Sequence, residues 1–191
     1  MLVIIGPSAS GKSSVARELH RRRVLRVHPT WTTRPRRQDE RPGCLEHRFV
    51  GDVAFDRRCA QGFFVETVTW LGGAHRYGLP RLPAPSPGLV DAVILRAPFV
   101  EAFARRVGDP LVYQIEDTAE RARQRLVSRG CGAAELAARL DDHQRERLVG
   151  RRIAHRVFVN DRSLAVLVEA VAAALREDLT DHSIERGGLA S

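Results

Sequence analysis

Lysine is almost absent from this chain of 191 residues, since only one of its 31 lysines and arginines is a lysine. Cysteine is also scarce. Cys44, Cys59 and Cys131 are odd in number and far apart, which gives no close metal-ligand spacing and indicates free thiols in a reducing compartment. No stretch approaches the roughly 20 apolar residues that span a membrane, and the N-terminus enters a predicted strand without a basic leader. We therefore expect a cytoplasmic protein with no membrane partner.

Aromatic residues make up only 6% of the chain, whereas the net charge is +8. A basic balance of this size is compatible with nucleic-acid binding. However, binding of single strands needs aromatic platforms among the basic residues, and the chain has only two tyrosines. The arginines are also spread over the whole sequence. Anionic small molecules explain the charge as well, so we do not expect a nucleic-acid partner; the oligomeric state has no signature in the sequence.

The single lysine, Lys12, lies in a phosphate-binding loop pattern. Residues 6–13 read GPSASGKS, which is glycine, four residues, glycine, lysine and serine. An apolar run at residues 2–5 precedes the loop, and an amphipathic helix to about Arg23 follows it, as such a loop requires. A glycine turn that binds nothing would not need a lysine whose compact ammonium can reach phosphate oxygens.

The loop predicts ATP and Mg²⁺ as ligands, and hence small-molecule nucleotide substrates. Backbone N–H groups and the helix N-terminus would face the triphosphate. Lys12 would reach the β- and γ-phosphates and act in catalysis, and the Ser13 hydroxyl would be a ligand of Mg²⁺. The ATP-binding residues expected here are Gly6, Ser8, Ala9, Ser10, Gly11, Lys12, Ser13 and Ser14.

Strands and helices alternate along the rest of the chain. We expect further strands at residues 24–27, 89–95, 111–115 and 156–159, and helices at 98–106, 117–128, 134–149 and 164–175. Asp117 to Glu120 predict a capping box. Residues 30–78 show no long helical repeat, and residues 79–88 carry four prolines and are expected to be a loop. The alternation predicts an α/β fold with a five-stranded parallel sheet flanked by helices.

Several segments together resemble the guanylate kinase family. They follow the order of the family from residue 2 to about 175, and each alone is a weak signal. The segments are Thr32-Thr33-Arg34 with Arg37 and Glu40; Gly43 and residues 47–50 (HRFV); residues 62–66 (GFFVE) with Tyr77-Gly78; Arg125 to Arg139; and residues 157–161 (VFVND).

The resemblance implies the P-loop NTP hydrolase fold with a small inserted acceptor-binding subdomain and a lid. A single domain would cover residues 1–177. Its core would comprise 1–29 and 89–177, the acceptor-binding insert 30–88, and the lid 129–139. Residues 178–191 would form a flexible tail.

The resemblance also implies roles for individual residues. Arg34 and Arg37, three apart, would fork onto the phosphate of the acceptor. Tyr77 would add a hydroxyl donor, and His47 stands where the family usually has a tyrosine that binds the same phosphate. Glu66 would read guanine, because a carboxylate accepts hydrogen bonds from N1–H and the exocyclic amine.

Four further residues receive roles from the same resemblance. Thr30 falls near the serine that the family uses for the guanine carbonyl. Arg129 and Arg139 would close from the lid onto the phosphoryl group in transfer, acting with Lys12 and Arg34 in catalysis. Asn160 would contribute to ATP binding.

The acceptor side departs from the family pattern. Family members usually end the third strand with paired aspartates, one of which helps to hold Mg²⁺, whereas this chain has Arg96 in the second position and Asp91 further upstream. Leu79 replaces a small hydroxyl residue. Arg96 would either bind an anionic acceptor richer in phosphate than GMP, or pair with Glu66 and close the guanine site.

Three functions are therefore open at this point. The first is a guanylate kinase that makes GDP from GMP and ATP, which Glu66, residues 32–34 and Arg37 favour. The second is phosphorylation of a sugar phosphate, since ribose 1,5-bisphosphate phosphokinases resemble the same frame and also lack the paired aspartates. The third is a non-catalytic guanylate-kinase-like binding module. Such modules commonly lose the phosphate loop, which is complete here.

Overall fold

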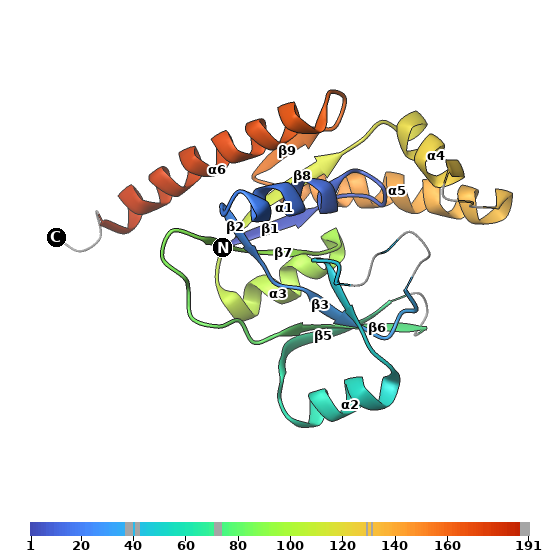
Figure 1. The fold of residues 1–191 in the computed structure, drawn as a ribbon, viewed down its shortest axis with the longest axis horizontal. Helices are drawn as coiled ribbons and strands as arrows, with labels where there is room; N and C mark the ends of the chain where they lie inside the picture. The colour runs from blue at the N-terminus through green and yellow to red at the C-terminus, as the bar shows by residue number, and fades with distance from the viewer. Residues whose placement is uncertain (37–39, 41–42, 71–73, 129, 131, 188–191) are drawn as a thin grey trace.

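The structure is a computed structural model that describes residues 1–36, 40, 43–70, 74–128, 130 and 132–187 (Figure 1). Among the helices in these ranges, none combines the length and the apolar character needed to cross a membrane. The chain forms two sheets, one of five strands and one of four, with helices packed against them.

The five-stranded sheet is parallel throughout, as the alternation of strands and helices predicts. Its strand order is β2-β7-β1-β8-β9. All four residues of β1 are fully buried, which matches the continuous apolar run expected of a strand covered on both faces. The strands are β1 (Leu2–Ile5), β2 (Leu25–Val27), β7 (Val90–Ile94), β8 (Leu111–Glu116) and β9 (Arg156–Val159).

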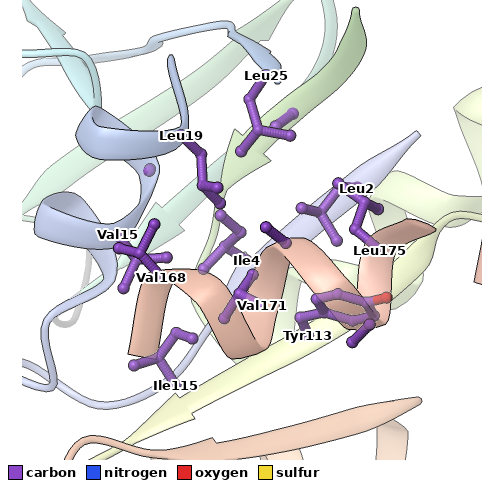
Figure 2. Close-up of a cluster of buried hydrophobic side chains, with 14 of the residues drawn as sticks. Leu2, Ile4, Val15, Leu19, Leu25, Tyr113, Ile115, Val168, Val171 and Leu175 are labelled. Carbon is purple, nitrogen blue, oxygen red and sulfur yellow. The ribbon is translucent and has the colours of Figure 1, made fainter. Parts of the chain in front are cut away.

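Helices cover both faces of this sheet because side chains of a strand alternate between the faces. Leu2 and Ile4 of β1 pack with α1 (Lys12–Arg21) and α6 (Leu164–Gly187), and Figure 2 shows this cluster of buried side chains. On the opposite face, Val3 and Ile5 pack with the 3-10 turn η1 (Ala97–Phe99) and with α3 (Val100–Val107). Helix α5 (Ala133–Ile153) packs against η1, β8 and α4 (Ala119–Ser128).

The insert forms the four-stranded sheet. Its strand order is β4-β3-β6-β5, with β3 and β4 parallel and the other pairs antiparallel. It also holds α2, a nine-residue helix with one buried side chain, Phe55, so no apolar repeat marks it in the sequence. The elements are β3 (Thr30–Thr32), β4 (His47–Phe49), α2 (Asp52–Ala60), β5 (Phe64–Trp70) and β6 (His75–Pro80).

Two local expectations are corrected by the structure. The helix-capping hydroxyl belongs to Thr118, which accepts from the Arg121 N–H at 3.2 Å, whereas Asp117 accepts from the Thr118 N–H and forms an ion pair with Arg125. The segment expected to be a loop from Leu79 begins two residues later, because β6 continues to Pro80, which is paired with Phe64. Proline is tolerated there because the pairing is irregular at this point, with a register shift between Phe64 and Glu66 on the partner strand.

Helix α6 extends through residues 178–187, beyond residue 175 where we expected it to end. The side chain of Asp178 ties the start of this extension to the sheet. Its carboxylate accepts hydrogen bonds from the guanidinium of Arg156 on β9 and from the hydroxyl of Tyr113 on β8. Both partners lie far away in the sequence, so the composition of the segment gave no sign that it is tied to the sheet.

We expect Asp178→Asn to lower the free energy of unfolding by about 1–3 kcal/mol at neutral pH. The Arg156 hydrogen bond holds the pKa of the Asp178 carboxyl below its ordinary value. The stabilisation is therefore present above the unfolded-state pKa and is lost as the pH falls through the folded-state pKa. Urea unfolding at neutral and at strongly acidic pH should show the difference from wild type shrinking on acidification. Glu177→Gln, which alters an exposed carboxylate on the same helix, should change little.

Candidate functional site

A cleft of about 1050 Å³ lies between the phosphate-binding loop and the insert. One wall is formed at the carboxyl ends of the parallel strands, where ligands of open α/β sheets bind. The opposite wall comes from the strands of the insert and the segment that joins β3 to β4. Lining residues that the sequence singles out are Gly6, Ser8, Ala9, Gly11, Lys12, Ser13, Ser14, Thr30, Arg34, His47, Glu66, Tyr77, Arg96 and Asn160.

The loop has the backbone shape that its glycines allow. Gly6 and Gly11 have φ angles of +136° and +104°, in the region that favours glycine. A Cβ on Gly6 would lie 2.0 Å from the carbonyl oxygen of Ile115, so an alanine does not fit. Asn160 donates from Nδ2 to the Ser10 carbonyl oxygen at 2.9 Å, and Ser10 itself is buried beneath the loop rather than on the cleft wall.

Lys12 folds over the loop. Its Nζ donates to the carbonyl oxygens of Gly6 at 2.7 Å and Pro7 at 2.8 Å. The ammonium therefore lies at the mouth of the loop, where a triphosphate would meet the backbone N–H groups.

Arg125 is a further residue on the donor side of the cleft. Its guanidinium donates to the carbonyl oxygen of Ala9 at 2.7 Å and forms an ion pair with the buried Asp117 at 2.5 Å. Helix α4 thereby contacts the loop at Ala9, whose φ of 65° lies in the left-handed region. Sequence reasoning missed this role because the two contacting segments are more than a hundred residues apart.

Arg34 is buried on the acceptor side, with 7% of its surface exposed. Glu40 accepts two hydrogen bonds from its guanidinium, at 3.0 and 2.6 Å, and the ring of Phe49 lies 5.1 Å from its central carbon. Burial alone would lower the pKa of the Arg34 guanidinium, but the Glu40 hydrogen bonds raise it above its ordinary value. Arg34 therefore remains a charged donor inside the cleft. Arg37, its expected partner, lies outside the described residues.

Thr30, His47 and Tyr77 lie together beside Arg34. The Thr30 hydroxyl and the His47 Nδ1 are 2.8 Å apart, and the rings of His47 and Tyr77 make an edge contact at 5.9 Å. All three line the cleft. Thr30 and His47 lie on the neighbouring strands β3 and β4, and Tyr77 lies on β6. The structure thus places three of the polar residues that the resemblance assigns to the acceptor next to one another.

Glu66 lines the same wall from β5. Its Oε2 accepts a hydrogen bond from the Arg106 guanidinium of α3 at 3.2 Å, and its Oε1 accepts from the Thr67 N–H. With these two hydrogen bonds in place, Glu66 still lines the cleft. The alternative that Arg96 pairs with Glu66 and closes the site is contradicted, because Arg96 pairs elsewhere.

The expected lid is only partly within the described residues. Arg129 lies outside them. Residues 133–139 form the first turns of α5, and Arg139 on that helix is not among the residues that line the cleft. Its predicted role as a catalytic arginine therefore stays a prediction that needs movement of this segment toward the cleft.

Arg96 follows β7 and pairs with two carboxylates of α5. It donates to Asp142 at 2.8 and 2.6 Å and to Glu146 at 3.1 Å. Glu146 is 4% exposed, and its Oε1 has no hydrogen-bond partner among the described residues. Burial raises the pKa of the Glu146 carboxyl, against the opposing effect of Lys12 and Arg96. The positive charge that interrupts the family pattern is thus balanced by acids from α5.

We expect Arg96→Met to lower the free energy of unfolding by about 3 kcal/mol at neutral pH, because it removes the arginine that forms an ion pair with the buried Glu146. The Glu146 carboxyl already has a raised pKa. Removing the cation raises it further, so the deficit should grow as pH rises above the ordinary carboxyl pKa and shrink on acidification. Urea unfolding over a pH series measures it. Arg105→Met, which breaks an exposed pair with Glu101, should have almost no effect.

Glu46 is a cleft residue that sequence reasoning did not single out. It precedes His47 in the segment between β3 and β4, and its carboxylate accepts a hydrogen bond from the Ser13 hydroxyl of the phosphate-binding loop. Thr30 holds the Glu46 carbonyl oxygen with its N–H at 2.9 Å and its hydroxyl at 3.2 Å. The signal in the sequence that could have drawn attention to Glu46 is its position directly before His47, which the resemblance predicts to bind the acceptor phosphate.

Two guanylate kinases align with most of this chain. The guanylate kinase of Thermobifida fusca is 34% identical over 151 residues, which are 73% of this chain and 72% of that protein. The guanylate kinase of Gloeobacter violaceus is 34% identical over 187 residues, which are 95% of this chain and 89% of that protein. No family model matches the chain.

The fold is also similar to a solved structure. The crystal structure of guanylate kinase from Anaplasma phagocytophilum superposes with a TM-score of 0.67 at 22% sequence identity. The match covers 93% of this chain and 85% of that one. It therefore includes the parallel sheet and the insert that face each other across the cleft.

Proposed function

The chain belongs to the guanylate kinase family, and we propose that it transfers the γ-phosphoryl group of ATP to GMP, forming ADP and GDP. One observation carries the proposal: the phosphate-binding loop with Lys12 and the acceptor-side residues Arg34 and Glu66 line the same cleft. Free Cys44 and Cys59 are in keeping with work in the reducing cytoplasm, where both nucleotides occur.

The donor half of the cleft suits a triphosphate. Its positive groups are the backbone N–H groups of the loop, the N-terminus of α1 and Lys12. Positioning and charge neutralisation account for most of phosphoryl-transfer catalysis, since the protein does little covalent chemistry. On binding, Lys12 would exchange its two loop carbonyl partners for phosphate oxygens.

The acceptor half suits a guanine nucleotide. Glu66 presents a carboxylate that can accept from guanine N1–H and the exocyclic amine, an arrangement that adenine does not offer. Arg34 and Tyr77 offer donors to the phosphate of the acceptor, with His47 beside them. Arg34 is already oriented by Glu40, so less side-chain freedom is lost when a phosphate arrives.

In the proposed reaction, an ionised phosphate oxygen of GMP attacks the γ-phosphorus in line with the leaving group. The bond from phosphorus to the oxygen that bridges it to the β-phosphate breaks, and ADP leaves with that electron pair. The attacking oxygen carries no proton to be removed, so the chain needs no general base. Its residues hold the two anions at bonding distance and offset their charge.

The residues around the loop fit Mg²⁺ as the partner of ATP. The Ser13 hydroxyl would be a ligand, and a carboxylate lies next to it. Such hard oxygen donors are the ligands that Mg²⁺ prefers, together with substrate phosphates. When bound, the ion would offset the negative charge of the phosphates and the charge that develops during transfer.

Product analysis tests the proposal. Purified protein with ATP, Mg²⁺ and GMP should give GDP and ADP in equal amounts, followed by the phosphorus NMR signals of both products. Without GMP, ADP should form far more slowly. Release of inorganic phosphate in place of GDP would show an ATPase and overturn the proposed transfer.

A further inference from the structure

Four carboxylates of the described residues line the cleft, and three of them are paired with arginine. The pairs are Glu40 with Arg34, Glu66 with Arg106 and Glu146 with Arg96. The fourth, Glu46, has no arginine or lysine partner in the part of the chain that the structure describes, and its side chain accepts from the Ser13 hydroxyl alone. In a chain so rich in arginine, a cleft carboxylate left without a cation is an exception.

The two carboxylates at the carboxyl end of β8 likewise form ion pairs with arginines. Glu116 at the end of β8 accepts from Arg151 and Arg147, and Asp117 after it pairs with Arg125. At the end of β7 stands a cation, Arg96. Among the described residues at the carboxyl ends of β7 and β8, the two strands that flank β1, no acid is therefore uncommitted.

Glu46 reaches the loop from the opposite wall. Its backbone is held against β3 through Thr30, so the side chain projects from a secured position. It meets Ser13, the loop residue whose hydroxyl faces the phosphates in this motif. Two hard oxygen donors, a hydroxyl and an unpaired carboxylate, thus converge at one point of the cleft. Mg²⁺ with a nucleotide is typically held by one or two such groups and by phosphate oxygens.

We propose that Glu46 is an oxygen ligand of the Mg²⁺ that accompanies ATP, supplied by the acceptor-binding insert in place of an acid at the end of β7. The inference rests on the proposed function, because it presumes that the loop binds ATP. The Ser13 hydrogen bond occupies the carboxylate when no cation is present, and the cation takes its place on binding. Because His47 and Thr30 adjoin Glu46, the same ion would tie the acceptor wall to the donor loop.

The test compares the Mg²⁺ dependence of nucleotide binding in wild type and Glu46→Gln. Isothermal calorimetry with a non-hydrolysable ATP analogue, the β,γ-imido compound, gives its affinity at a series of Mg²⁺ concentrations. We expect Glu46→Gln to need about tenfold more Mg²⁺ or higher for half of the effect, with metal-free binding of the analogue as strong as in wild type. Glu46→Asp should fall between the two.

Electron paramagnetic resonance of Mn²⁺ gives a second readout without turnover. With ADP present, wild type should bind Mn²⁺ more tightly than Glu46→Gln by a similar factor. Glu120→Gln, which removes an exposed negative charge on α4 outside the cleft, should match wild type in both experiments. Thermal unfolding of each variant checks that the fold is kept.

The outcomes distinguish a failure of the Glu46 assignment from a failure of the proposed function. If Glu46→Gln binds the analogue with the Mg²⁺ dependence of wild type, the assignment of Glu46 is wrong and the proposed function stands. If Glu120→Gln changes the dependence as much as Glu46→Gln, the effect is general charge and the assignment is again wrong. If wild type binds no analogue with or without Mg²⁺, the proposed function and the inference both fail.

Discussion

Lys12→Ala is expected to lower kcat for GMP phosphorylation by about 10³-fold. The loss has a direct physical cause, since Lys12 is the one lysine of the chain and its ammonium lies at the mouth of the phosphate-binding loop. Its ammonium donates to two loop carbonyl oxygens, and the buried Glu146 near it keeps its ion pair with Arg96 when Lys12 is removed, so the free energy of unfolding should change little. A coupled assay of ADP release and urea unfolding measure the two quantities.

Lys12→Arg should also be poorly tolerated. A planar guanidinium is bulkier than an ammonium and suits flat bidentate partners rather than a narrow loop. Arg21→Ala provides the control on the same helix, because that side chain is exposed and pairs with the neighbouring Glu18. Full activity in Lys12→Ala would remove the kinase assignment.

Glu66→Gln is expected to lower kcat/KM for GMP by about 10- to 100-fold, the usual cost of leaving a buried polar group of the ligand without its partner. The amide keeps the size of the side chain but offers a single acceptor oxygen where guanine presents two donors. Affinity for ATP should not change, since Glu66 lies on the insert and the ATP site lies on the loop. Steady-state kinetics with GMP varied and then ATP varied separate these effects.

Glu101→Gln on α3 is a suitable control, because it alters an exposed carboxylate away from the cleft wall. Should Glu66→Gln leave kcat/KM for GMP at the wild-type value, the reading of guanine by this residue would be wrong. A parallel loss of ATP affinity would instead indicate damage to the whole cleft.

The parts of the fold that the sequence predicts are those with local causes. Four consecutive apolar residues define β1, and the loop pattern with its glycines fixes the turn that follows. Helix α2 was not predicted, because a single buried side chain, Phe55, gives no periodicity. The extension of α6 beyond residue 175 was not predicted either, because the contacts of Asp178 with Tyr113 and Arg156 join it to strands that are distant in the sequence.

The same division applies to the candidate site. The donor loop is contiguous, so its residues could be named from the pattern. The acceptor wall required the resemblance, because Thr30, Glu66 and Tyr77 are spread over three strands. Partners of charged groups were not identified from the sequence, and the one pair that it suggested, Arg96 with Glu66, is wrong. Arg96 is balanced by α5, and Glu46 meets Ser13 across 33 positions of sequence.

The central claim is that GMP is the acceptor, and a screen of acceptors with ATP and Mg²⁺ tests it most directly. GMP, AMP, CMP, UMP and sugar phosphates including ribose 1,5-bisphosphate are compared by kcat/KM in the same coupled assay. A carboxylate that pairs with the guanine edge predicts a preference for GMP over AMP of at least about 10²-fold. Equal rates with GMP, AMP and CMP, or faster transfer to a sugar phosphate, would contradict the account.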